Sequence, residues 1–152
     1  MSESIYCPIR KLWVAALPEE QIRQRLLDHM IKEQGFPSAH IAIEKSLASM
    51  PHLAVDGRKI PSRRADIVCF SQGIHPQYTL FPLLLIECKA VPLTSKVLNQ
   101  TAGYNHYLQA YFIAVVNQTE IKTGWYDHSQ SQYVYVDFLP SYSELVKSIK
   151  TT

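Results

Sequence analysis

Residues 83–90 form an apolar run that ends in two charged side chains, and this feature constrains the fold most strongly. The run suits a buried strand, and it is far shorter than the roughly 20 apolar residues that a membrane span needs. Side chains on a strand alternate between its two faces, so Glu87 and Lys89 share one face and Cys88 belongs to the other. Burying an unpartnered charge costs several kcal/mol. Glu87 and Lys89 therefore need each other, a third charge or a metal ion.

A third charge lies on the preceding apolar segment, residues 65–70, where Asp66 is the one carboxylate. The same alternation places Asp66 on the face of Arg64 and Val68, near the end of this strand. If a hairpin-like excursion joins the two strands, Asp66 and Glu87 lie side by side. Arg64 is then expected either to contact a phosphate or to form an ion pair with Asp66.

Two neighbouring carboxylates repel each other, and one pKa rises unless a divalent cation lies between them. Hard oxygen ligands such as those of Asp66 and Glu87 suit Mg²⁺ or Mn²⁺. Lys89, further along the same strand, can hold or deprotonate an attacking water and offset charge on a phosphate. The three residues together predict metal-dependent hydrolysis of a phosphodiester.

Helical and strand-like patterns alternate along the chain. Pro18 suits a first helical position, and Gly35 and Pro37 end the helical periodicity that follows it. Thr94 or Ser95 is a cap for a second helix. The expected helices span 19–34, 95–109 and 141–150, and the expected strands lie at 40–44, 65–70, 83–90, 111–116, 124–126 and 133–136.

Turn residues separate these elements. Asp56-Gly57 marks a hairpin tip, and Gly73, Pro76 and Pro82 break the chain before the strand that carries Glu87 and Lys89. The strand–helix–strand step around the second helix implies a right-handed crossover and a parallel pair of strands, whereas the hairpins before it are antiparallel. We therefore expect an α/β fold with a mixed sheet and helices on both of its faces.

Length and net charge bear on the number of domains and on the binding of nucleic acid. With 152 residues, the chain is expected to form a single domain over 1–152. The net charge of +2 is too small to indicate nucleic acid, so a positive field would have to come from a local cluster. That cluster comprises Arg58, Lys59, Arg63 and Arg64.

Cysteine usage and the N-terminus bear on the compartment. The three cysteines, Cys7, Cys69 and Cys88, have no paired spacing and suit reduced thiols. The N-terminus does not have the layout of a signal peptide. We expect a cytoplasmic protein that does not enter a membrane.

The order of Asp66 and then Glu87-Cys88-Lys89 at the end of an apolar strand resembles the PD-(D/E)xK nuclease superfamily. Within it, the chain looks like the N-terminal nuclease domain of type I restriction enzyme R subunits and its stand-alone relatives. The matching segments are 63–68, 85–90 and 100–105, and the resemblance covers about residues 19–117. It implies a restriction-endonuclease-like mixed sheet flanked by helices.

The resemblance also implies roles for residues beyond the central three. Gln100 and Tyr104 match a Gln-x-x-x-Tyr motif whose members approach the site or the DNA backbone, Gln100 as part of the catalytic set and Tyr104 as a nucleic-acid contact. The backbone carbonyl of Cys88 is expected to join Asp66 and Glu87 as a metal ligand. An additional acidic residue is expected at Glu20, within Glu-x-Ile-Arg near the helix start, with Glu44 as the competing candidate.

Two departures from the family pattern differ in their consequences. Ala65 replaces the proline of the superfamily name, which matters little because this family often lacks that proline. The sequence also has no Gly-x-x-x-x-Gly-Lys-Ser/Thr phosphate-binding loop, which a helicase motor would need. The resemblance thus implies a DNA endonuclease without the motor, using Mg²⁺ or Mn²⁺, as a homodimer or in a larger restriction or repair complex. The alternatives are a non-cutting module that binds DNA or protein, and a nuclease that acts on RNA or on branched or single-stranded DNA.

Overall fold

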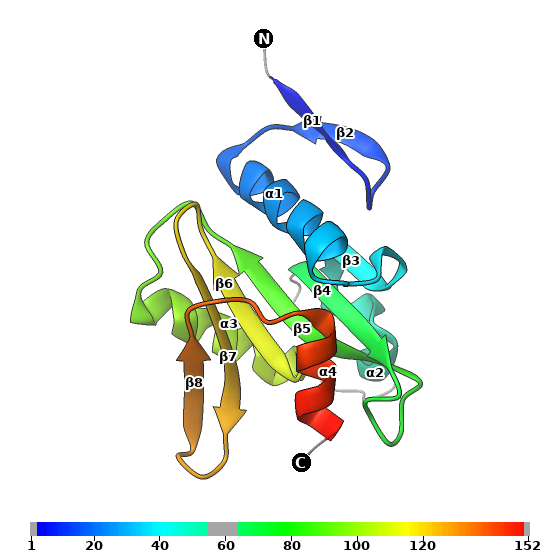
Figure 1. Ribbon diagram of the computed structural model, residues 1–152, viewed down its shortest axis with the longest axis vertical. Coiled ribbons are helices and arrows are strands. Elements are labelled where there is room, and N and C mark those ends of the chain that lie inside the picture. Colours follow the sequence, from blue (N-terminus) through cyan, green and yellow to red (C-terminus); the bar gives the residue numbers. More distant parts are fainter. Residues whose placement is uncertain (1–2, 55–63, 151–152) are drawn as a thin grey trace.

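The computed structural model describes residues 3–54 and 64–150, in which a six-stranded mixed sheet has helices on both faces (Figure 1). The strand order is β3-β4-β5-β6-β7-β8. The parallel pair is β5 and β6, and the other neighbours in this sheet are antiparallel. The strands are β3 (Ile41–Ser46), β4 (Arg64–Gln72), β5 (Leu80–Cys88), β6 (Phe112–Val116), β7 (Ile121–Asp127) and β8 (Gln132–Val136). The α/β class and the parallel step are confirmed, and the architecture is consistent with a restriction-endonuclease-like fold.

Helices α1 (Pro18–Glu33) and α4 (Tyr142–Lys150) cover one face of the sheet, and α3 (Ser95–Leu108) covers the other (Figure 1). The first face packs a cluster that includes Leu27, Leu145 and Ile86. The second packs a cluster that includes Leu108 and Leu85. Because β5 contributes to both clusters, it is buried on both sides, and its polar end is held in a fixed position.

Local chemistry sets the helix boundaries. Pro18 occupies the first turn of α1, and Glu19 and Glu20 favour the positive end of the helix dipole. Gly35 follows the helix with a φ of +75°, a backbone conformation that residues with a side chain rarely adopt. The side chain of Thr94 caps α3 by accepting a hydrogen bond from the backbone N–H of Val97 at 3.4 Å. Each observed end lies within one residue of the sequence-based prediction.

Two predictions about β5 were wrong. Pro82 does not break the chain but lies inside the strand, and the strand ends at Cys88, so that Lys89 follows it. The register between β4 and β5 shifts between Cys69 and Phe70, and Phe70 then pairs with Pro82. A bulge is one of the few places where a sheet accepts proline, because the missing N–H breaks no regular ladder bond there.

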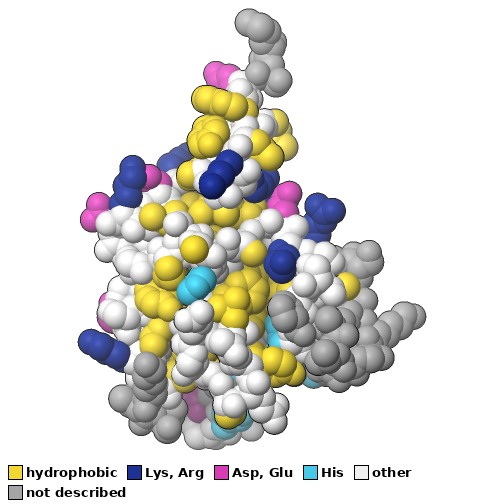
Figure 2. Space-filling view, turned by 90° about the vertical axis from the view of Figure 1, so that its right-hand side faces the viewer, with side chains coloured by type: hydrophobic (Ala, Val, Ile, Leu, Met, Phe, Trp, Pro, Cys, Tyr) yellow, Lys and Arg dark blue, Asp and Glu magenta, His cyan; other side chains and the backbone are white. Residues whose placement is uncertain are grey.

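An N-terminal hairpin, β1 (Ser4–Cys7) and β2 (Leu12–Ala15), was not anticipated from the sequence. It projects beyond α1 and carries exposed hydrophobic side chains, which gather at one end of the molecule in Figure 2. Trp13 is 67% exposed and packs edge-on against Tyr6. Cys7, the last residue of β1, is by contrast fully buried.

Shorter elements complete the chain: α2 (Pro51–Ala54) and 3-10 turns at Ser38–His40 and Leu47–Ser49. The predicted tip at Asp56-Gly57 and the basic residues Arg58, Lys59 and Arg63 lie outside the described residues. The three cysteines are free and buried, as expected. Among the described helices, none has the length and apolar character needed to cross a membrane.

Candidate active site

A cavity of about 370 Å³ lies where α1, β3, β4 and the end of β5 meet. It contains the three residues that the sequence singled out, Asp66, Glu87 and Lys89. The full lining is Glu19, Arg23, Glu44, Arg64, Asp66, Glu87, Cys88 and Lys89. Two carboxylates from adjacent strands and the ammonium group of the residue that follows β5 therefore line one polar space.

The backbone of the strand beside Asp66 is unusual at one position. Strand β4 runs unbroken through Asp66, and its register with β3 is the same on both sides of that residue. On β3, Glu44 has a φ of +52°, which residues with a side chain rarely adopt. The carboxylates of Glu44 and Asp66 both contact Arg23 on α1.

Both oxygens of Asp66 accept hydrogen bonds. Oδ2 accepts from the backbone N–H of Cys88 at 2.7 Å, and Oδ1 accepts from Nη1 of Arg23. Burial raises the pKa of Asp66 above its ordinary value, and the Cys88 N–H and the positive charge of Arg23 offset part of that rise. These two bonds hold the Asp66 carboxylate in one orientation beside the end of β5.

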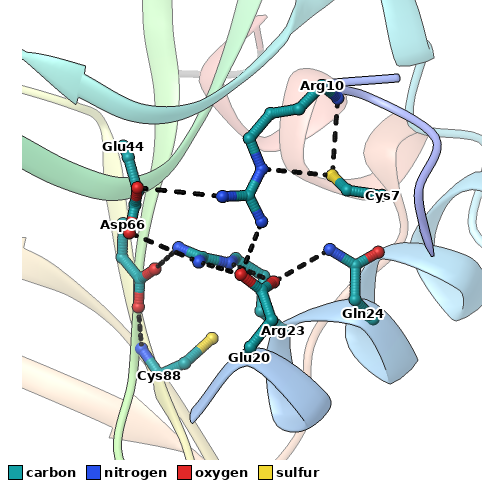
Figure 3. A network of polar contacts seen from close by, with 8 residues as sticks. All are labelled: Cys7, Arg10, Glu20, Arg23, Gln24, Glu44, Asp66 and Cys88. Carbon is teal, nitrogen blue, oxygen red and sulfur yellow. Dashed lines mark hydrogen bonds and ion pairs between the residues drawn. The ribbon is translucent and has the colours of Figure 1, made fainter. Parts of the chain in front are cut away.

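Arg23 is the centre of a polar network that extends from the cavity to the N-terminal hairpin (Figure 3). Its Nε and Nη2 donate to the two oxygens of Glu20 at 3.0 and 2.7 Å. Arg10 donates to the same carboxylate at 2.5 Å and lies 3.7 Å from Glu44. Burial raises the pKa of Glu20, but hydrogen bonds from Arg23, Arg10 and Gln24 outweigh it and lower the pKa to about 2.

The far side of the cavity is formed by the end of β5. Glu87 is 6% exposed and pairs with Val115 of the parallel strand β6. Just after the strand, the backbone N–H of Lys89 donates to the carbonyl of Val116 at 2.8 Å, which fixes the chain while the side chain borders the cavity. The side chain of Cys88 belongs to the core and is unavailable as a nucleophile.

The remaining candidates are divided between the cavity and its surroundings. Arg64 and Glu44 line the cavity, whereas Glu20 belongs to the Arg23 network behind it. Gln100 is exposed on α3 and Tyr104 is 5% exposed in the core, and neither lines the cavity. The structure thus brings together Asp66, Glu87, Lys89 and Arg64, and it leaves the Gln-x-x-x-Tyr pair apart from them.

Arg23 and Arg10 were missed at the sequence level. A signal for Arg23 was present, because it stands in the apolar stripe of α1 with Leu26, Leu27 and Met30, at core-facing spacing. A buried arginine in such a stripe requires acidic partners. Arg10 had no comparable signal, since it comes from a turn that the sequence did not predict.

The donor atoms suit a hard divalent cation. In the part of the chain that the structure describes, no three His, Cys, Asp or Glu side chains are grouped so that they alone could hold a metal. Mg²⁺, however, commonly uses one or two protein carboxylates and keeps several waters. Each oxygen of Asp66 retains a lone pair beyond its hydrogen bond. Asp66, Glu87 and the Cys88 carbonyl are therefore compatible with such an ion.

The depressed pKa of Glu20 predicts acid sensitivity. Because the folded-state pKa is about 2 and the ordinary value is 4.5, the unfolded chain binds more protons between these values. The stabilisation is fully present above about pH 5 and is lost as the pH falls toward 2. Urea unfolding from pH 7 to pH 3 should show a smaller loss of stability for Glu20→Gln than for the wild type. An equal loss of stability in the variant and the wild type would show that Glu20 does not have a lowered pKa in the folded protein.

Comparison with known proteins identifies the family of the chain. The family model described as type I restriction enzyme R protein N terminus matches residues 18–140, which include α1, the whole sheet and every residue that lines the cavity. No curated protein and no solved structure matches the chain. The match spans well over half of the chain and agrees with the PD-(D/E)xK pattern of Asp66, Glu87 and Lys89. The chain belongs to the type I restriction enzyme R protein N-terminal family.

Proposed function

We propose that this domain is a DNA endonuclease that hydrolyses phosphodiester bonds with Mg²⁺ or Mn²⁺ as cofactor. The observation that carries the proposal is the convergence of Asp66, Glu87 and Lys89 in one polar cavity of a chain that belongs to a restriction enzyme family. A protein that restricts DNA would act in the cytoplasm. Cutting both strands requires two sites, which a homodimer or a larger restriction or repair complex would supply.

The residues of the cavity divide the chemistry among them. Asp66, Glu87 and the Cys88 carbonyl would hold the ion, which supplies a water of lowered pKa and offsets charge on the phosphate. Lys89 can orient that water or accept its proton, and its positive charge can stabilise charge that develops on the phosphate. Arg64 is exposed at the rim of the cavity and can bind the phosphate backbone next to the scissile bond.

Metal removal tests the proposal directly. Purified protein incubated with supercoiled plasmid should produce nicked or linear DNA in Mg²⁺ or Mn²⁺. EDTA should abolish the reaction, and excess metal should restore it. A panel of double-stranded, single-stranded and branched DNA and of RNA, run at one metal concentration, would identify the substrate class. No cleavage of any substrate in either metal would overturn the proposal.

A second candidate is a nuclease fold that binds DNA or protein without cutting. The observation that favours it is the ion pair between Arg23 and Asp66, since a protein cation already neutralises the principal carboxylate. This alternative predicts DNA binding that weakens steeply with salt but no metal-dependent cleavage. The substrate panel, combined with DNA binding measured at two salt concentrations, separates the two functions.

A further inference from the structure

Arg23 is 6% exposed, and its guanidinium lies among three carboxylates at the edge of the cavity. It pairs with Glu20 at 2.7 Å, with Glu44 at 3.4 Å and with Asp66 (Figure 3). One fixed positive charge therefore forms ion pairs with carboxylates from α1, β3 and β4. Such a charge is costly to bury, and it is tolerated because its partners surround it.

Arg23 is held in place independently of Asp66. Its Nε and Nη2 bond the two oxygens of Glu20, one turn earlier on the same helix, in the paired geometry that restricts a guanidinium most strongly. Only Nη1 is then left to reach Asp66. The guanidinium is thus fixed by α1 and presents its remaining edge to the carboxylate.

Arg10 is a natural comparison within the same network. It pairs with Glu20 at 2.5 Å and with Glu44 at 3.7 Å. Among the ion pairs of the described residues, the partner of Asp66 is Arg23 and not Arg10. The two arginines therefore share acidic partners but differ in contact with the proposed metal ligand.

We infer that Arg23 is a resident counter-ion of the metal site, which neutralises Asp66 in the metal-free protein and competes with the divalent ion for that carboxylate. The inference rests on the proposed function. A cation beside a ligand opposes the arrival of a second cation, so Arg23 keeps metal affinity low. The same cation prevents repulsion among Glu20, Glu44 and Asp66, so it also stabilises the metal-free fold.

The sign of the effect distinguishes this role from ordinary structural support. Replacing Arg23 by methionine keeps an unbranched side chain but removes the charge. Mn²⁺ should then bind the chain roughly tenfold more tightly or better, since the positive charge that opposes the arriving ion at contact distance has been removed. A residue that merely positions Asp66 would give weaker binding when removed.

Titration with Mn²⁺ alone, followed by electron paramagnetic resonance without DNA, provides the main measurement. The melting temperature with and without Mn²⁺ provides the second. Arg23→Met should melt about 5 to 15 °C lower without metal, the range expected from breaking a buried ion pair in a chain of this size, and should recover more with Mn²⁺ than the wild type. Arg10→Met is the matched control, and its Mn²⁺ affinity should stay within about threefold of wild type because the charge removed does not touch Asp66.

Should Arg23→Met fail to fold, the double variant Glu20→Gln, Arg23→Met removes a negative charge with the positive one and still frees Asp66. Tighter Mn²⁺ binding by the double variant supports the inference. If the wild type binds Mn²⁺ and cuts DNA but the Arg23 variants bind no more tightly, or Arg10→Met shows the same gain, the inference fails alone. If the wild type and all variants bind no Mn²⁺, the proposed function fails and the inference fails with it.

Discussion

Replacing Asp66 by asparagine is expected to lower the rate of metal-dependent cleavage by about 10³-fold or more, since a catalytic metal supplies several kcal/mol of transition-state stabilisation. Asparagine has nearly the same shape but only one oxygen. That oxygen can accept either from the Cys88 N–H or from Arg23, whereas Asp66 accepts from both. The variant therefore loses the negative charge that would attract the ion, and it loses one of the two bonds that orient the side chain.

The measurement is the initial rate of plasmid nicking at saturating Mg²⁺, with Mn²⁺ titration on the same preparations. Circular dichroism should show an intact fold, because Arg23 retains Glu20 as a partner. Asp28→Asn is the matched control, since Asp28 is exposed on α1 and pairs with Lys32 away from the cavity. Cleavage at the wild-type rate by a folded Asp66→Asn would remove Asp66 from the site.

The central part of the fold could be predicted because strong local patterns and the global architecture agree there. Strand β5 is apolar until Glu87, α3 has a capping threonine, and β6 is apolar throughout. Short connections and the handedness of the crossover then leave one arrangement, with β5 and β6 parallel. The position of Glu87 and Lys89 at one end of the sheet follows from that arrangement.

Elements whose conformation depends on tertiary contacts were harder to predict from the sequence. Strands β1 and β2 have four residues each, and the turn between them uses Lys11 at a φ of +56° where glycine or asparagine would have given a signal. Pro82 could be recognised as a strand residue only from its register with β4. In each case the neighbouring segment, and not the local sequence, determines the conformation.

In the candidate site, too, some features follow from local sequence patterns and others depend on tertiary contacts. Periodicity brought Asp66, Glu87 and Lys89 together, because strand ends meet at a shared edge. The resemblance favoured Glu20 over Glu44 as the additional acidic residue. Both carboxylates contact Arg23 in the structure, but Glu44 lines the cavity and Glu20 does not. Sequence spacing alone could not show that Tyr104 enters the core beneath the sheet.

Lys89 offers the means to separate metal binding from chemistry. Under the proposed function it acts on the water and the phosphate and does not hold the ion. Lys89→Met keeps most of the apolar stem and removes the ammonium group, so cleavage should fall by about 10²- to 10⁴-fold, the usual contribution of a positioned general acid or base. The backbone bond from Lys89 to Val116 is independent of the side chain and should keep the end of β5 in place.

The decisive comparison sets cleavage beside Mn²⁺ affinity for Lys89→Met and for Lys96→Met. Lys96 lies in the first turn of α3, is exposed and does not line the cavity, so its variant should cut at close to the wild-type rate. Lys89→Met should cut slowly while binding Mn²⁺ at least as tightly as the wild type, because a positive charge has been removed from the cavity. Loss of both cleavage and Mn²⁺ binding would instead assign Lys89 to the support of the metal ligands, and unchanged cleavage would remove it from the reaction.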